Sequence, residues 1–254
     1  MLDFGYDEGG GNGTLLVSAQ IGTTKRLRRF TRNWNTALRK SGVKFFHSKD
    51  YGNITSGVFV KLDDRARTRL LGKCAGLIHD FVNVGITARI DLSIYKAETT
   101  PAFRNKWGTA FCFGVETVIL AGSLYMEEKG RETEPVNILI EQGHANAGQA
   151  IDHITDAMQG SSIVKIRSCG KASKEDHPLL QAADMLAYSE WQQMTAGGEV
   201  LFSALNVEGT PYATHIFDCT PELIRVVKQG VDRRDALCKA FGLRVHAAHA
   251  PRSQ

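Results

Sequence analysis

The chain has 254 residues, of which 43% are hydrophobic and 23% charged, so it is long enough to bury a sizeable core as an ordinary globular protein. Its net charge of +4 permits a polyanionic partner without requiring one. Its five cysteines are scattered and never spaced as Cys-x-x-Cys, which argues against a disulfide framework and against a thiolate zinc site.

The sequence also lacks the usual signals for secretion or membrane insertion. It has no basic-then-apolar segment at its start, and no uninterrupted apolar run approaches the ~18 residues that suggest a membrane span. We therefore expect a cytoplasmic protein without a membrane partner.

The first predicted element is a strand over residues 2 to 7. Its apolar residues alternate with small or acidic ones, namely Leu2, Phe4 and Tyr6 against Asp3, Gly5 and Asp7. Because alternate side chains of a strand point to opposite faces, Asp7 should point away from the apolar face. The glycines at 9 to 11 permit unusual backbone turns and leave room for a ligand. Alternatively, residues 7 to 10 form only an acidic turn that ends a hairpin strand.

Strands and helices alternate along the rest of the chain. Periodicity predicts strands over residues 14 to 21, 43 to 46, 86 to 95, 135 to 141 and 162 to 167. It predicts helices over residues 24 to 41, 62 to 82, 101 to 128, 143 to 160 and 177 to 194, and Thr220, Pro221 and Glu222 carry the signature of another helix start. We expect one mixed α/β domain over residues 1 to 245, with helical insertions, a loop at 195 to 199 and a disordered tail at 246 to 254.

The helix expected over residues 24 to 41 has a cationic face. Arg28, Arg29 and Arg32 lie mostly off its apolar side, together with Lys25 and Arg39. These side chains could hold a phosphate backbone, since an acidic centre alone would repel a polyanion. The alternative is an ordinary solvated face.

Three acidic residues occupy positions that a fold could bring together. Asp7 and Glu141 each end a predicted strand, whereas Asp184 lies on the helix expected at 177 to 194. Ligands of open sheets collect beyond strand ends, and Mg²⁺ prefers hard oxygen ligands, so these acids predict a divalent-metal site. Alternatively, Asp184 and Gln181 only cap and solvate a surface helix.

The same late helix carries a row of polar side chains. His177, Gln181, Asp184 and Tyr188 are spaced by four, three and four residues, which places them on one side of a helix. The row therefore combines an imidazole, an amide and a carboxylate beside a face of small residues.

Several motifs resemble those of a bacterial and phage family called domain of unknown function 3800. They are Tyr6-Asp7-Glu8-Gly9-Gly10, Phe46-His47-Ser48-Lys49-Asp50, the strand-end acid Glu141, and residues 177 to 188. The resemblance implies a ribonuclease H-like mixed sheet flanked by helices, and a metal-dependent nuclease. It places Asp7 and Glu8 as first-strand acids, Glu141 as the middle acid and Asp184 as the last, with His47 and Gln181 in supporting places. The chain departs from the pattern at Gly9, where the family has serine, and at Glu141, where aspartate is common.

The chemistry that the resemblance implies is phosphodiester hydrolysis with one or two Mg²⁺ or Mn²⁺ ions. Asp7, Glu141 and Asp184 are the expected metal ligands. Glu8 would join them only if the strand bends, because strict alternation sends it to the other face from Asp7. His47 and His177 are candidate proton carriers, with His144 a further one.

Substrate contacts are expected from Lys49, Gln181, Arg28, Arg29 and Arg32. The expected partner is nucleic acid, and a protein partner or a homo-oligomer stays open. Two other functions remain alternatives. One is a non-catalytic nucleic-acid- or protein-binding subunit of a phage-defence or mobile-element system, and the other is a nucleotide phosphohydrolase.

Overall fold

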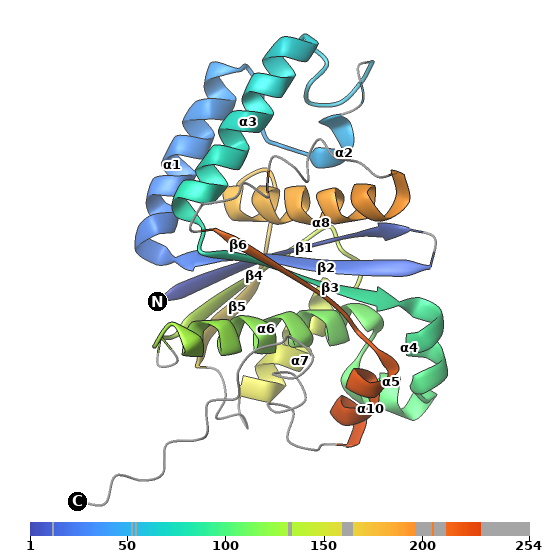
Figure 1. Ribbon diagram of the computed structural model, residues 1–254. Helices are drawn as coiled ribbons and strands as arrows, with labels where there is room; N and C mark the ends of the chain where they lie inside the picture. Colours follow the sequence, from blue (N-terminus) through green and yellow to red (C-terminus); the bar gives the residue numbers. More distant parts are fainter. Residues whose placement is uncertain are drawn as a thin grey trace, which may run out of the picture.

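The computed structural model contains a mixed β-sheet with helices on both faces (Figure 1). It describes residues 1–11, 13–51, 53, 55–131, 134–158, 165–196, 205 and 212–229. Within these residues the sheet has six strands in the order β5-β4-β1-β2-β3-β6. The strands are β1 (Leu2–Gly11), β2 (Thr14–Thr23), β3 (Val84–Asp91), β4 (Val136–Glu141), β5 (Ile166–Ala172) and β6 (Ala213–Asp218).

The strand directions make this a mixed sheet. β2 pairs antiparallel with both β1 and β3, whereas β4 is parallel to β1, β5 to β4 and β6 to β3. The predicted fold class, a mixed α/β sheet flanked by helices with helical insertions, is therefore confirmed.

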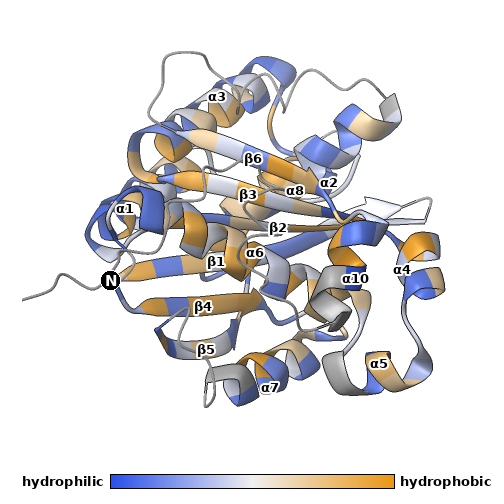
Figure 2. Cartoon of the chain, turned by 60° about the horizontal axis from the view of Figure 1, so that its bottom comes forward, coloured by the Kyte–Doolittle hydropathy of each residue, from blue (hydrophilic) through white to orange (hydrophobic). Residues whose placement is uncertain are grey.

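The helices form a layer on each face of the sheet (Figure 1). One layer holds α1 (Thr24–Lys40), α2 (Ser48–Tyr51), α3 (Asp64–Phe81) and α8 (Pro178–Ala196). The other holds α4 (Leu92–Glu98), α5 (Pro101–Trp107), α6 (Ala110–Glu128), α7 (Ala147–Met158) and α10 (Pro221–Gln229). Since both faces are covered, the central strands are buried on both sides, and Figure 2 shows hydrophobic residues running along them.

The two faces of β1 pack differently. Leu2, Phe4 and Tyr6 are buried in the core that includes α6, as the predicted alternation requires. The opposite face of β1 lies against α8, where Gly5 and Gly9 allow a close approach. A β-carbon on Gly5 would lie 2.8 Å from Leu179 Cγ, and α8 could not pack this close without moving.

Helix α6 is long and apolar enough to cross a membrane by length and composition alone. Of its most apolar window, 67% is buried inside the protein. It contacts β2 and β3, and its buried residues belong to the core of the sheet. This burial is the pattern of a core helix.

The structure corrects several predicted boundaries. Residues 43 to 46 form no strand, because the Phe46 backbone N–H donates to the Gln181 side chain. The helix predicted over residues 101 to 128 is interrupted at Gly108, whose φ is +89°. β3 ends at Asp91, which caps α4 through the backbone N–H groups of Ser93 and Ile94. The predicted strand over residues 86 to 95 was therefore too long.

Other differences concern the second half of the chain. α7 begins at Ala147, later than predicted, and β6 was not predicted. β5 spans Ile166–Ala172, and the predicted start of this strand at residue 162 lies outside the described residues. The predicted helix start at Thr220 is confirmed, since its hydroxyl accepts from the Leu223 backbone N–H at 3.3 Å. The tail at 246 to 254 and most of the loop at 195 to 199 lie outside the described residues.

Candidate active site

The packing of α8 on β1 brings two carboxylates together. Asp7 lies on the α8-facing side of β1, and Asp184 lies on α8. Both are buried, with 4% and 7% of their surfaces exposed. Burial raises the pKa of Asp7 well above its ordinary value, and the nearby charge of Asp184 raises it further. Of the three acids expected to form one metal site, Asp7 and Asp184 thus lie on the same side of the sheet.

A lysine that the sequence motifs did not point to bridges these acids. The Nζ of Lys174 lies 2.8 Å from Asp7 Oδ2 and 2.9 Å from Asp184 Oδ1. Burial would lower the pKa of this ammonium, but the two carboxylates raise it above the ordinary lysine value. Lys174 is therefore charged at neutral pH, and one ammonium faces two buried carboxyl groups.

Asp184 also links α8 to the first residue of α2. The Ser48 backbone N–H donates a 2.6 Å hydrogen bond to Asp184 Oδ2. Although burial opposes ionisation, Lys174 and this N–H donor hold the pKa of Asp184 below its ordinary value. The pair is thus asymmetric, because Asp184 is the carboxyl that ionises readily.

Gln181 is buried next to the site and hydrogen-bonds to the backbone around it. Its Oε1 accepts hydrogen bonds from Trp34 Nε1 at 2.7 Å and from the Phe46 backbone N–H at 2.8 Å. Its Nε2 donates to the Lys174 carbonyl at 2.8 Å. With 1% of its surface exposed, Gln181 does not line the cavity. The structure therefore places this predicted substrate contact as a positioning residue, which holds the backbone that carries Lys174.

The acids open into a cavity of about 690 Å³ at the edge of β1. The lining residues are Asp7, Glu8, Gly9, Gly10, His47, Lys49, Glu141, Gly143, His144, Lys174, Asp184, Tyr188 and Trp191. β4 pairs with β1 only as far as Tyr6, so the following residues of β1 are not covered by β4. The predicted residues Asp7, Glu8, His47, Lys49, Glu141 and Asp184 therefore share one cavity.

Glu8 reaches the cavity although its neighbour Asp7 faces α8. It lies on the part of β1 beyond Tyr6, which β4 does not cover. Glu8 Oε2 contacts His144 Nε2. The His144 Nδ1 accepts from the Asn146 backbone N–H at 3.0 Å, which places the proton of a neutral ring on Nε2. The ring also stacks on Phe111, with centroids 3.7 Å apart.

The other predicted histidines differ in position. His47 lines the cavity, and its Nδ1 lies 3.2 Å from Asp50 Oδ2. His177 does not line it, and its carbonyl accepts from the backbone N–H groups of Leu180 and Gln181 at the start of α8. Of the predicted polar row on α8, only Asp184 and Tyr188 reach the cavity.

The predicted basic face of α1 lies away from the acids. Arg28, Arg29 and Arg32 are exposed, and none of them lines the acidic cavity. The Arg29 guanidinium lies 5.6 Å from the centroid of Phe81, at the end of α3. Lys49 is the predicted cationic substrate contact that the structure brings to the cavity.

The cavity supplies some, but not all, of the oxygen ligands that a hard divalent cation needs. One carboxylate oxygen of Asp7 and one of Asp184 both contact the Lys174 ammonium, and carboxylate oxygens are also the ligands that such a cation prefers. Among the residues that the structure describes, no three His, Cys, Asp or Glu side chains are close enough to hold a metal ion. The predicted shell of Asp7, Glu141 and Asp184 is thus not formed in this arrangement. Two of its members are in place, and the third lines the same cavity.

Comparisons with known proteins give a similarity to solved structures alone. No protein-family model matches the chain, and no curated protein matches it. The fold is similar to the crystal structure of ribonuclease H2 from Pyrococcus horikoshii OT3, with 14% sequence identity, coverage of 96% of this chain and 100% of that chain, and a TM-score of 0.37. The family resemblance stays a prediction, and the residues of the cavity carry the proposal that follows.

Proposed function

We propose that the protein is a divalent-metal-dependent nuclease that hydrolyses phosphodiester bonds at the cavity between β1 and α8. The observation that carries this proposal is the buried pair of Asp7 and Asp184, which faces one cation at the base of an open cavity. Two further acids, Glu8 and Glu141, line the same cavity. A site with this surplus of carboxylates suits a metal ion that is shared with a phosphate.

Asp7 and Asp184 would hold the ion, and Glu141 would be the third ligand. When bound, Mg²⁺ or Mn²⁺ supplies an activated water and stabilises the charge of the leaving oxygen. Lys174 and Lys49 both line the cavity. Their ammonium groups would neutralise phosphate oxygens, which the acids alone would repel.

Glu8, with His144 as its hydrogen-bond partner, would accept a proton during the reaction. His144 donates from Nε2 to Glu8 Oε2, which orients the carboxylate and leaves Oε1 to accept a proton from water. The stack on Phe111 and the hydrogen bond from Asn146 hold the imidazole in this orientation. Glu8 is therefore the proposed general base, and His144 its positioning residue.

Incubation of the protein with end-labelled single- and double-stranded DNA and RNA, in Mg²⁺, in Mn²⁺ and in excess EDTA, tests this proposal. We expect internal cleavage of at least one polymer that requires the metal. Release of phosphate from nucleoside triphosphates without cleavage of any polymer would instead assign a nucleotide phosphohydrolase. Cleavage that persists in EDTA would rule out the metal mechanism.

One observation favours a second candidate, a non-catalytic nucleic-acid- or protein-binding module. Lys174 already ion-pairs with both Asp7 and Asp184, as in a purely structural buried ion pair. This candidate predicts no change of melting temperature on addition of Mn²⁺, and no cleavage. The nuclease predicts a rise of the melting temperature with Mn²⁺ concentration, because a ligand that binds only the folded state stabilises it.

A further inference from the structure

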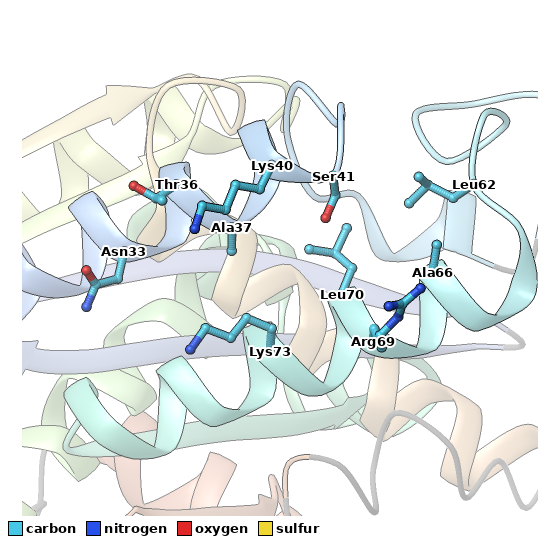
Figure 3. A pocket seen from close by; sticks show the side chains of 10 residues that line it. All are labelled: Asn33, Thr36, Ala37, Lys40, Ser41, Leu62, Ala66, Arg69, Leu70 and Lys73. Carbon is cyan, nitrogen blue, oxygen red and sulfur yellow. The ribbon is translucent and has the colours of Figure 1, made fainter.

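A second cavity lies between α1 and α3, on the same side of the sheet as α8 (Figures 1 and 3). It has a volume of about 730 Å³. Its lining residues are Asn33, Thr36, Ala37, Lys40 and Ser41 from α1 and its C-cap, Leu62 from the loop between α2 and α3, and Ala66, Arg69, Leu70 and Lys73 from α3. We refer to these ten residues as the α1–α3 groove.

The α1–α3 groove is cationic. Three of its lining residues, Lys40, Arg69 and Lys73, are basic and exposed, and no lining residue is acidic. None of the three forms an ion pair with another residue in the described part of the chain. Their charges are therefore available to an anionic ligand.

Helical spacing directs these side chains into the groove. Arg69 and Lys73 are four residues apart on α3, which places them one turn apart, about 6 Å along the axis, on one side. Asn33, Thr36 and Lys40 repeat the spacing on α1. In Figure 3, Lys40 and Lys73 come from opposite sides of the groove. Hydrogen-bonding side chains of α1 thus accompany the three charges.

The rest of α1 extends the positive surface beyond the groove. The helix contains seven lysines and arginines and no acidic residue. The other 24 basic residues of the chain are outnumbered by its 27 acidic ones. The positive charge of this protein is therefore concentrated on α1, which is the distribution expected of a polyanion-binding face.

The groove contains no aromatic side chain on which a base could stack. Contacts to phosphates alone position a nucleic acid without reading its sequence. The groove and the acidic cavity share no lining residue, so binding in one can be altered without changing the other.

We infer that the α1–α3 groove binds the phosphate backbone of a nucleic acid, independently of sequence, through Lys40, Arg69 and Lys73. The class of ligand rests on the proposed function, and the groove is the surface that holds the polymer while the acidic cavity cuts it. Binding in the groove does not use the carboxylates. It is therefore measurable in EDTA, where no metal-dependent cleavage occurs.

The test is the salt dependence of binding to labelled single- and double-stranded oligonucleotides of several sequences, measured by fluorescence anisotropy in EDTA. The variant is the triple substitution Lys40→Gln, Arg69→Gln and Lys73→Gln. Each lost phosphate contact should reduce the slope of log K against log salt by about 0.7 to 0.9. We expect the slope to flatten by about 2 to 3, with binding weakened alike for all sequences.

Two further triple variants serve as controls. Lys96→Gln, Lys129→Gln and Lys165→Gln remove the same net charge from exposed positions outside α1 and α3, and should change the slope by less than one contact, about 0.7. Arg28→Gln, Arg29→Gln and Arg32→Gln probe the remaining basic face of α1. If the lysine control flattens the slope as much as the groove variant, or if the arginine variant flattens it and the groove variant does not, the groove assignment is wrong.

Single variants, lipid vesicles and a cleavage assay provide further tests of the α1–α3 groove. If the groove triple variant fails to fold, Lys40→Gln and Lys73→Gln are tested singly, each with an expected change of about 0.7 to 0.9 in slope. An unchanged slope would overturn the proposal. So would binding of the wild type to anionic phospholipid vesicles without binding to oligonucleotides. Normal binding in EDTA with no cleavage in Mn²⁺ would contradict the proposed nuclease and leave the groove intact.

Discussion

Lys174 neutralises the two buried carboxyl groups of the acidic cavity, so its loss should destabilise the folded protein. Its ammonium separates Asp7 and Asp184, which are both buried. Removal of one partner from a buried ion pair leaves uncompensated charge, which typically costs about 3–5 kcal/mol. Two carboxylates without their cation repel each other as well, so this region should be strongly sensitive to the loss of the lysine.

We expect Lys174→Met to lower the free energy of unfolding at pH 7 by about 3 kcal/mol or more, measured by chemical denaturation. Lys174 lowers the pKa of Asp184, so the stability it contributes is present above the ordinary aspartate pKa and is lost as the pH falls through the folded-state pKa. The difference between variant and wild type should therefore shrink in acid. Lys171→Met, at an exposed lysine on β5, should cost less than about 0.5 kcal/mol. Equal losses for the two variants would contradict this account.

Asp7 should behave in the opposite way. Burial and the charge of Asp184 raise its pKa, so the folded state favours the protonated carboxyl. The stability due to this proton is present below the ordinary aspartate pKa and is lost as the pH rises through the raised one. Asp7→Asn should therefore match or exceed the wild type in unfolding free energy at pH 7, with a weaker decline of stability as the pH rises. A large loss of stability at pH 7 would show that the negative charge of Asp7 is needed for folding.

The acids and the supporting residue Gln181 could be singled out from the sequence, whereas Lys174 could not. Glu141 ends β4, but the strand predicted to end at Asp7 continues to Gly11, and Asp7 directly follows the last residue of β1 that pairs with β4. Lys174 belongs to no periodic pattern, and its role depends on how the segment between β5 and α8 folds back onto Asp7. Gln181 shares a helix side with Asp184, but Trp34 and Phe46 cover it, and both lie far away in the sequence.

At the scale of elements, the approach of α8 to β1 sets the geometry of the site. Gly5 lets Leu179 lie where a β-carbon would otherwise be, and Gly9 does the same for Ala187. The Asp7 carboxylate lies between these two contacts along β1. A larger residue at either glycine would push α8 away and separate the acids.

We expect Gly5→Ala to lower the free energy of unfolding by about 1–3 kcal/mol, because its β-carbon would lie 2.8 Å from Leu179 Cγ. Gly72→Ala on α3 is the matched control, since a β-carbon there meets nothing within 4 Å. Alanine is favoured over glycine in a helix by about 0.8–1.0 kcal/mol, so the control should be stabilised. Denaturant titrations of both variants check the difference, and stabilisation by Gly5→Ala would contradict the close packing.

Periodicity identified most of the elements but not their interruptions. The helix predicted over residues 101 to 128 breaks at Gly108, where the Tyr95 hydroxyl donates to the carbonyl at 3.1 Å. The choice between a continued helix and a break thus depends on α4, which the sequence analysis did not predict. The segment at 43 to 46 has the apolar residues of a strand, but Gln181 takes the hydrogen bond of Phe46.

At the scale of the whole molecule, one side of the sheet carries both the acidic cavity and the α1–α3 groove. α8 supplies Asp184 to the cavity, and α1 and α3 supply the cations of the groove. A polyanion held by the groove would lie on the same side as the acids. This arrangement answers the electrostatic difficulty noted from the sequence, that an acidic centre alone repels its substrate.

The measurement that tests the central proposal most directly is the rate of Mn²⁺-dependent cleavage of a labelled nucleic acid by Asp7→Asn, Asp184→Asn and His177→Gln. The first two variants remove the charge of a proposed metal ligand with almost no change in volume, whereas His177 lies outside the cavity. We predict that both aspartate variants lose cleavage and keep binding in EDTA, and that His177→Gln keeps both. Cleavage at the wild-type rate by either aspartate variant would contradict the proposal.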